Sequence, residues 1–237
     1  MSKTILITGG SGAVGRSLVR RFRRDGDDVA FTYNTNTASA DALVHETGAA
    51  AFQAELTDRA QVKVMVAGAL ERFGRIDVLI NNAGFTQVMP FALIEEEDWD
   101  EVIARNLKTM FLVTREVTRG MVARKSGVII NLSSLAGHRL LEVPVHYATA
   151  KAGVSGFTLA LAKELARYNI RVNTVVPGLL EDGVGKMVPE KELAEYVRFC
   201  SAGRVGKTTE VADVIAFLAS DAASYINAQN IFVDGGI

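Results

Sequence analysis

The chain opens on a short apolar run that leads straight into a cluster of glycines, Ile5-Leu6-Ile7-Thr8-Gly9-Gly10-Ser11-Gly12-Ala13-Val14-Gly15. A helical pattern follows over residues 13–24. A strand that turns through glycines into a helix lets backbone amides and the helix dipole approach a phosphate group. The string alone is weak evidence, because any tight turn of this kind favours glycine. Its place at the start of an alternating pattern strengthens the prediction of a dinucleotide site.

Beyond this turn, short apolar runs alternate with longer amphipathic segments, as in a parallel sheet with crossover helices. Predicted strands cover residues 3–8, 28–33, 49–54, 76–81, 127–132, 171–176 and 230–233. Predicted helices cover residues 13–24, 38–47, 59–73, 97–124, 147–168 and 209–219, with Asp58 and Thr208 as N-caps. The pattern predicts an α/β, doubly wound Rossmann fold, a seven-stranded parallel sheet with helices on both faces.

The stretch 181–206 breaks this alternation. It contains Gly183, Gly185 and Pro189, and only a short amphipathic piece follows them. Irregular segments after the carboxyl end of a strand commonly cover active sites. We therefore predict a substrate lid here, within a single catalytic domain over residues 1–237.

Composition narrows the class of protein. The formal net charge is −1, from 26 Lys and Arg against 27 Asp and Glu, which argues against a nucleic-acid or membrane partner. The single cysteine, Cys200, excludes an internal disulfide and suits a reducing compartment. The first residues lead directly into a strand, and no apolar run approaches the ~18 residues that span a bilayer. We expect a cytoplasmic protein.

Tyr147 and Lys151 stand four residues apart in one predicted helix, thirteen residues after Ser134. Residues at this spacing share a helix face. A tyrosine hydroxyl titrates near 10 in water, so acid–base work at neutral pH needs a nearby cation that lowers its pKa, and Lys151 is such a cation. Ser134 would donate a hydrogen bond to a substrate oxygen if it ends a strand beside this helix. The alternative is a helix whose tyrosine packs and whose lysine is solvated.

The end of the second predicted strand bears on the choice between NAD and NADP. An acidic residue there would accept hydrogen bonds from the adenosine ribose and favour NAD. The chain has Tyr33-Asn34-Thr35-Asn36 instead, so a 2′-phosphate would meet no carboxylate, and Asn34, Thr35 and Arg16 could donate to it. We therefore predict NADPH/NADP+ as the cofactor. The alternative is that Asn34 and Asn36 only terminate the strand and cap the next helix.

Further motifs follow in order: Asn81-Asn82-Ala83-Gly84, Asn106, Ile130-Asn131-Leu132-Ser133-Ser134, Pro177-Gly178 and Asp234-Gly235-Gly236. With the first turn and the Tyr–Lys pair, they make the chain resemble the short-chain dehydrogenase/reductase family over essentially its whole length. The segment 202–206, Ala-Gly-Arg-Val-Gly, is similar to the 3-oxoacyl-acyl-carrier-protein reductases of fatty acid biosynthesis and to polyketide ketoreductases.

The resemblance implies roles for individual residues. Tyr147 would be the proton donor, Lys151 would lower its pKa and bind the nicotinamide ribose, Ser134 would polarise the carbonyl, and Asn106 would hold a water. Cofactor contacts are implied at Gly9, Ser11, Gly12, Val14, Gly15, Tyr33, Asn34, Thr35, Leu56, Asn82, Ala83, Gly84, Tyr147, Lys151, Pro177, Gly178 and Leu180. Substrate contacts are predicted at Ser134, Leu135, Ala136, His138, His146, Leu179 and Met187. No metal site is expected, since none of the three histidines has metal-ligand spacing.

Three positions depart from the family's pattern. Ala13 stands where a glycine is usual, and Gly12 stands where NADPH-using members often carry a basic residue. Asp182 occupies a place where a threonine often touches the nicotinamide amide. Recognition of that amide would then shift to backbone groups near Leu179 and Leu180.

The leading hypothesis is an NADPH-dependent reduction of a 3-oxoacyl thioester on acyl-carrier protein to the 3-hydroxyacyl form. The alternatives are an NAD(P)-dependent dehydrogenase of a free ketone, alcohol, steroid or sugar, and a non-catalytic dinucleotide-binding regulator, which would not need the whole catalytic set. The predicted helices 97–124 and 147–168 carry apolar residues on more than one stripe. Relatives in this family pair through these helices and the final strand, so we expect a homotetramer.

Overall fold

The computed structural model describes residues 2–237, except for the side chains of Val184 and Met187. Within these residues, seven strands form one parallel sheet in the order β3-β2-β1-β4-β5-β6-β7. The strands are β1 (Thr4–Ile7), β2 (Asp28–Tyr33), β3 (Ala50–Gln53), β4 (Val78–Asn81), β5 (Gly127–Leu132), β6 (Ile170–Pro177) and β7 (Asn230–Val233). The helices are α1 (Ala13–Arg24), α2 (Thr37–Thr47), α3 (Arg59–Phe73), α4 (Glu96–Ile103), α5 (Thr109–Arg124), α6 (Val145–Leu165), α7 (Glu190–Phe199) and α8 (Thr208–Ala219). None of the described helices is long and apolar enough to cross a bilayer.

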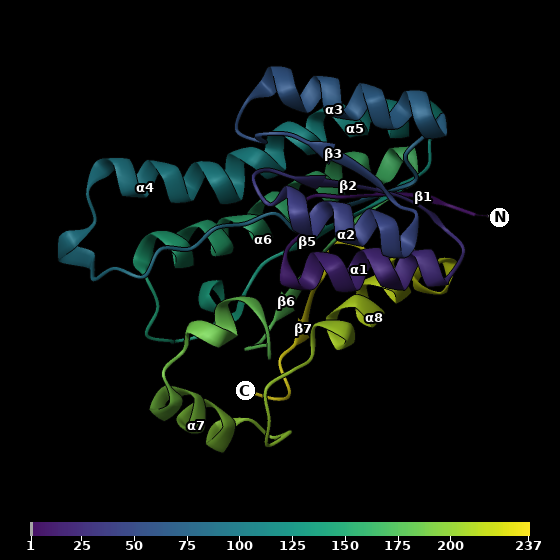
Figure 1. Ribbon diagram of the computed structural model, residues 1–237. Coiled ribbons are helices and arrows are strands. Elements are labelled where there is room, and N and C mark those ends of the chain that lie inside the picture. Colours follow the sequence, from purple (N-terminus) through teal and green to yellow (C-terminus); the bar gives the residue numbers. More distant parts are fainter. Residues whose placement is uncertain (1) are drawn as a thin grey trace.

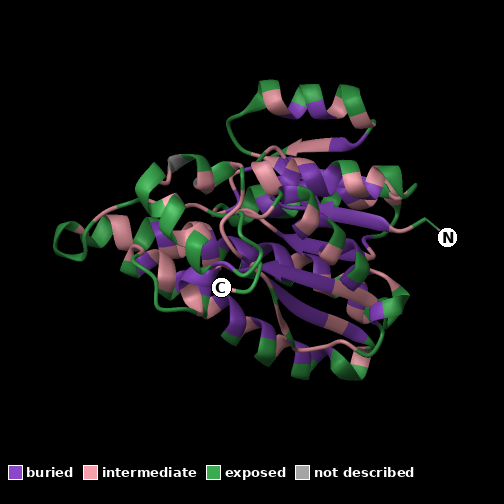
Figure 2. Ribbon diagram, turned by 90° about the horizontal axis from the view of Figure 1, so that it is seen from below, coloured by how far each residue is buried: buried purple, intermediate pink, exposed green. Residues whose placement is uncertain are grey.

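Helices cover both faces of this sheet (Figure 1). Ile5 and Ile7 of β1 point to the face covered by α1, α2 and α8, whereas Leu6 between them points to the face covered by α3, α5 and α6. All three side chains are fully buried, and such burial stabilises the fold by about 1.5–3 kcal/mol per side chain. Figure 2 shows the strands buried over most of their length and the helices exposed on their outer sides. The predicted doubly wound fold is confirmed.

Helix starts agree with the sequence in part. Asp58 caps α3 as predicted, accepting a hydrogen bond of 2.7 Å from the amide two residues on. Asn36 caps α2, because its side-chain oxygen accepts a hydrogen bond from the amide of Ser39. This agrees with the alternative interpretation of Asn36 as a cap of the helix after the second strand. The prediction of Thr208 as an N-cap is wrong, because Lys207 precedes α8 and Thr208 is its first residue. The Thr208 hydroxyl instead hydrogen-bonds that of Ser17 on α1 at 2.7 Å.

The long helix predicted over residues 97–124 is wrong as a single element. It consists of α4, a π-helical turn (Ala104–Lys108) and α5. Within the turn, the side-chain amide of Asn106 donates to the carbonyl of Val102 at 2.8 Å and to that of Phe85 at 2.7 Å. The Asn106 side chain thus occupies the Val102 carbonyl, one helical turn earlier in the chain. A side chain that inserts into the backbone hydrogen bonds in this way opens an α-helix into a wider π-helical turn.

The two ends of the segment 181–206 lie next to each other. An isolated parallel bridge joins Leu180 to Gly206, and two backbone hydrogen bonds of 2.9 Å close its base. Between these ends lie a 3-10 turn (Gly183–Met187) and α7. In Figure 1, α7 lies outside both helical layers. Because the bridge pairs its two ends, the segment 181–206 is a loop with a fixed base.

Candidate active site

The strands that lead into the sequence motifs end at one edge of the sheet. The glycine-rich turn follows β1, the Asn82-Ala83-Gly84 segment follows β4, Ser134 follows β5, and Pro177 ends β6. The order of strands reverses between β1 and β4, and ligands of doubly wound sheets bind in the crevice at such a point. The candidate site therefore lies outside the carboxyl ends of the central strands.

The turn after β1 leaves no room for a Cβ at three positions, Gly9, Gly10 and Gly15. Gly9 has φ +66°, and a Cβ there would lie 2.9 Å from the Cα of Ala83. A Cβ on Gly15 would overlap the carbonyl oxygen of Gly9. Asn82 then fixes the turn, since its side-chain amide donates to the carbonyls of Thr8 at 2.9 Å and Gly9 at 3.0 Å. The predicted cofactor residue Asn82 therefore holds the shape of the turn.

The start of α1 fits a pyrophosphate group. Gly12 precedes the helix and has no side chain to cap it, so the amides of the first turn receive no side-chain hydrogen bond. Gly12 is exposed, and Ser11 and Val14 are half-buried. Free amides and the helix dipole together favour an anion here. The residues present can accept the phosphates of a dinucleotide.

The adenosine end of the site differs from the sequence prediction in one respect. Asn34 and Thr35 follow β2 and are exposed, but the Asn34 side-chain amide donates to Glu55 at 2.9 Å. Burial opposes ionisation of Glu55, yet hydrogen bonds from Thr57 and Asn34 outweigh it and hold the Glu55 pKa below its ordinary value. A carboxylate from the segment after β3 therefore reaches the end of β2. Leu56, the next residue, is buried in the core.

Arg16 does not face this end of the site. Its guanidinium donates to the carbonyl of Ser11 and to the carboxylate of Asp182, both at 2.9 Å. Asp182 also pairs with Lys186 at 2.7 Å. The arginine that the sequence offered to a 2′-phosphate thus ties the glycine-rich turn to the segment 181–206.

Tyr147 and Lys151 share one face of α6, as predicted. The Lys151 ammonium lies 5.6 Å from the centre of the Tyr147 ring and donates to the Leu132 carbonyl at 3.2 Å. The lysine is 5% exposed, and this burial lowers the Lys151 pKa to about 8. Burial raises the pKa of Tyr147, while a hydrogen bond with Ser134 opposes the rise. The direction is opposite to the predicted one, and it keeps the hydroxyl protonated at neutral pH.

Asn106 joins this group through its π-helical turn. Its side-chain oxygen accepts from the amide of Phe85 at 3.3 Å. A Cβ placed on Gly84 would lie 3.0 Å from that oxygen and 3.2 Å from the Lys151 ammonium. Asn106 and Lys151 therefore converge on the backbone of Gly84. The structure brings together all four residues of the predicted catalytic set.

The predicted substrate contacts divide into two groups. Leu135 and Ala136 are buried in a 3-10 turn (Leu135–Gly137) directly after Ser134. His146 is fully buried, and its Nδ1 accepts from the amide of Tyr147 at 2.9 Å. His138 is turned toward Ser133 and Ser155 at the back of this segment and does not join the catalytic set.

Two further predicted contacts belong to the segment after β6. The Leu179 amide, which was expected to be free for a carboxamide, donates to the Tyr196 hydroxyl of α7 at 2.9 Å. The sequence gave no signal for Tyr196, because its partner lies 17 residues away across an irregular segment. Pro177 is buried, and Gly178 and Leu180 are half-buried. The Met187 side chain lies outside the described residues.

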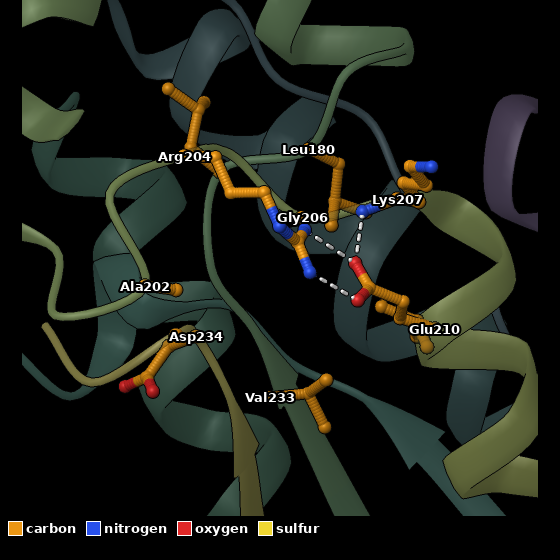
Figure 3. Close-up of a pocket in the computed structure, with 11 residues that line it drawn as sticks. Leu180, Ala202, Arg204, Gly206, Lys207, Glu210, Val233 and Asp234 are labelled. Carbon is orange, nitrogen blue, oxygen red and sulfur yellow. Dashed lines mark hydrogen bonds and ion pairs between the residues drawn. The ribbon is translucent and has the colours of Figure 1, made fainter.

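A small cavity of about 100 Å³ lies under the returning arm of this segment (Figure 3). Leu180, Arg204, Gly206 and Glu210 line it, and Tyr147 does not. Arg204 makes two hydrogen bonds with Glu210, at 2.8 and 2.6 Å, and with the Lys207 amide these lower the Glu210 pKa to about 2. The cavity therefore lies at the base of the segment 181–206, where Leu180 pairs with Gly206, and apart from Tyr147. No group of three or more potential metal ligands occurs among the described residues.

A phosphate-binding turn at the switch point of a parallel sheet, with a serine, a tyrosine and a buried lysine at its edge, defines a nicotinamide-dependent oxidoreductase. A family model described as "Enoyl-(Acyl carrier protein) reductase" matches residues 10–237. This chain belongs to the short-chain dehydrogenase/reductase family, and the predicted family is confirmed.

Several proteins of known identity are similar over the full length. The chain is 40% identical to the 3-oxoacyl-[acyl-carrier-protein] reductase of Thermotoga maritima, over 99% of this chain and 97% of that protein. It is 37% identical to the enzyme of the same name from Staphylococcus aureus, over 100% of this chain and 98% of that protein. A crystal structure of levodione reductase superposes with a TM-score of 0.92 at 33% identity, covering 99% of this chain and 96% of that one.

Proposed function

We propose that this chain reduces a 3-oxoacyl thioester carried on acyl-carrier protein to the 3-hydroxyacyl form. The observation that carries the proposal is the approach of Ser134 to Tyr147 beside the buried Lys151. Because the hydroxyls of Ser134 and Tyr147 lie within hydrogen-bond distance of each other, both can donate to the same carbonyl oxygen of a substrate. Full-length relatives at 36–40% identity are named 3-oxoacyl-[acyl-carrier-protein] reductases, which supports this substrate class.

The proposed chemistry assigns one task to each group. The nicotinamide cofactor, when bound, supplies the hydride that forms the new C–H bond. Ser134 donates a hydrogen bond to the carbonyl oxygen and stabilises the negative charge that develops there. Tyr147 transfers its proton to that oxygen as the C=O π bond breaks, and the product is a secondary alcohol.

The tyrosine must regain its proton after each turnover. Lys151 lies beside the Tyr147 ring, and with a pKa of about 8 it is protonated at neutral pH and easily deprotonated. Asn106, which meets Lys151 at Gly84, would hold a water that passes a proton from solvent. The ammonium would also bind the nicotinamide ribose and stabilise the transient phenolate.

We propose NADPH as the preferred reductant. The support is the absence of a carboxylate at Asn34 and Thr35, directly after β2. Glu55 opposes this preference, because its carboxylate contacts the Asn34 amide. Comparison of kcat/KM for NADPH and NADH in the wild type and in Glu55→Gln tests both effects. We expect the substitution to shift selectivity further toward NADPH.

We propose that residues 1–237 form one catalytic domain in which 181–206 is the substrate lid. One sheet draws strands from the whole chain, and the bridge between Leu180 and Gly206 closes the base of the segment. The Arg16–Asp182 pair ties it to the cofactor turn. Met187, within this lid, stays a predicted substrate contact.

We propose a homotetramer as the working form. Phe111 of α5 is 48% exposed and Leu159 of α6 is 49% exposed, and large apolar side chains in such positions favour burial by a second subunit. β7 is an edge strand with an unpaired side, which also favours pairing. The cytoplasm stays the predicted compartment, supported by the single cysteine.

Two observations favour other substrates. The similarity to levodione reductase supports reduction of a free diketone, with the same four residues acting on a different carbonyl compound. The matching family model is described as an enoyl reductase, which would place the hydride on a carbon–carbon double bond. In that reaction the negative charge would develop on the thioester oxygen as an enolate and the proton would end on the α-carbon, so Ser134 and Tyr147 would stabilise the enolate and no alcohol would form.

A single assay separates these functions. NADPH oxidation is followed with a 3-oxoacyl thioester on acyl-carrier protein, the matched 2-enoyl thioester and levodione as the free diketone. The proposal predicts the highest kcat/KM with the 3-oxoacyl thioester. A higher value with the enoyl thioester or the free diketone would contradict it.

A further inference from the structure

His138 follows the turn that carries Ser134, and its ring bridges two hydroxyl groups from other elements. Its Nε2 lies 3.3 Å from the Ser133 hydroxyl and 3.1 Å from the Ser155 hydroxyl. Ser133 follows β5 directly before Ser134, and Ser155 lies one turn beyond Lys151 on α6. The ring therefore joins the strand that ends at the reaction site to the helix of the proposed proton donor.

The hydrogen bonds determine which form of the ring is present. The Ser133 hydroxyl donates to the Lys151 carbonyl at 2.7 Å, and the Ser155 hydroxyl donates to the Asn230 side chain at 3.0 Å. A hydroxyl has one proton, so both oxygens can only accept from His138. The Nε2 atom must therefore carry a hydrogen, which is shared between the two serines.

Packing holds the ring in this place. It meets the Phe232 ring of β7 edge-on, with centres 5.4 Å apart and planes at 83°. The preceding Gly137 lies so close to α6 that a Cβ there would overlap the amide nitrogen of Ala152. Burial, and then the charge of the adjacent Arg139, lower the His138 pKa and favour the neutral ring.

We propose that His138 is a positioning residue, whose Nε2–H keeps Ser134 in register with Tyr147 through Ser133 and Ser155. The proposal rests on the proposed function for the role of Ser134. Two hydroxyls that act on one oxygen must hold their geometry closely, and misplacement by about 1 Å can cost ~10²-fold in rate. Without the bridge, the Ser133–Lys151 hydrogen bond and the Gly137 contact still hold the turn to α6, but the link from the turn to Ser155 is lost.

Three variants test this role. His138→Phe keeps a ring against Phe232 and removes the N–H, while His138→Gln replaces the ring and retains an N–H at similar reach. We expect His138→Phe to lower kcat roughly 10- to 100-fold, with the KM for NADPH changed by less than about 2-fold. His138→Gln should recover most of the lost kcat. His45→Ala, at an exposed position on α2, is the matched control and should behave as the wild type.

A second readout needs no substrate. The hydrogen bond with Ser134 lowers the Tyr147 pKa, so its loss in His138→Phe should raise that pKa. Tyrosine ring ¹³C NMR against pH measures the shift in the folded protein. A kcat within about 2-fold of wild type for His138→Phe, equal losses in the Phe and Gln variants, or an unmoved Tyr147 titration would each overturn the proposal. If the wild type reduces no 3-oxoacyl thioester but the Tyr147 titration moves, the proposed function fails and the positioning role stands.

Discussion

Lys151 carries a stability cost that can be measured separately from catalysis. Its ammonium is buried, and its pKa falls from an ordinary value of 10.5 to about 8. Between these values the unfolded chain holds a proton on this lysine that the folded chain has released. The unfolded state then binds more protons, so the free energy of unfolding rises with pH in this window. The full gap corresponds to about 3 kcal/mol, at about 1.36 kcal/mol per pH unit.

Lys151→Met removes the titrating group and keeps a side chain of similar shape. From pH 7.5 to 9.5 the free energy of unfolding of the wild type should rise by about 2 kcal/mol relative to that of the variant. The rise is smaller than the full value of about 3 kcal/mol because this range covers only part of the interval between the two pKa values. At pH 7.5 the two stabilities should be close, since the relieved burial cost is offset by the lost bond to Leu132, which contributes about 1.5–3 kcal/mol. Urea unfolding at both pH values measures the difference.

The exposed Lys63 of α3 provides a control for this prediction. Lys63→Met should leave the pH dependence of unfolding as in the wild type. If the difference between wild type and Lys151→Met stayed constant within about 0.5 kcal/mol across this range, the lysine would not be desolvated as described.

Three other changes have defined outcomes. Asn34→Asp places a carboxylate at the end of β2, and we expect the ratio of kcat/KM for NADH over NADPH to rise at least about tenfold; an unchanged ratio would contradict the adenosine site. Gly15→Ala should abolish cofactor binding in calorimetry while the chain stays folded by circular dichroism, because the added Cβ overlaps the Gly9 carbonyl; binding within about 2-fold of wild type would refute this. Asp58→Ala removes the cap of α3 and should lower the free energy of unfolding by about 1 kcal/mol with kcat unchanged.

The sequence predicted the sheet well because its signal is local. The bounds of β2, β5 and β7 agree with the predicted strands to the residue, and the other strands differ by at most two residues at either end. Runs of consecutive apolar residues between polar turns mark strands covered on both faces. The shared helix face of Tyr147 and Lys151 followed from their spacing of four residues, whereas the place of Ser134 beside them depended on its ending a strand next to this helix.

Several of the failures involve contacts between distant residues. The π-helical turn was missed because the apolar period continues through it, and only the bond from Asn106 to Phe85 and Val102 reveals the break. Arg16 was expected near the cofactor phosphate, but its partner Asp182 lies 166 residues away. His138 was expected at the pocket, and its place depends on Ser155, on another element.

In the proposed reaction, Tyr147 protonates the carbonyl oxygen of the substrate. The most direct test is Tyr147→Phe, which removes one hydroxyl and leaves Lys151 in place. We expect NADPH oxidation driven by a 3-oxoacyl thioester to fall by ~10²–10⁴-fold, while NADPH still binds with nearly wild-type affinity by fluorescence titration. A variant that kept more than about a tenth of wild-type activity would show that Tyr147 is not the proton donor.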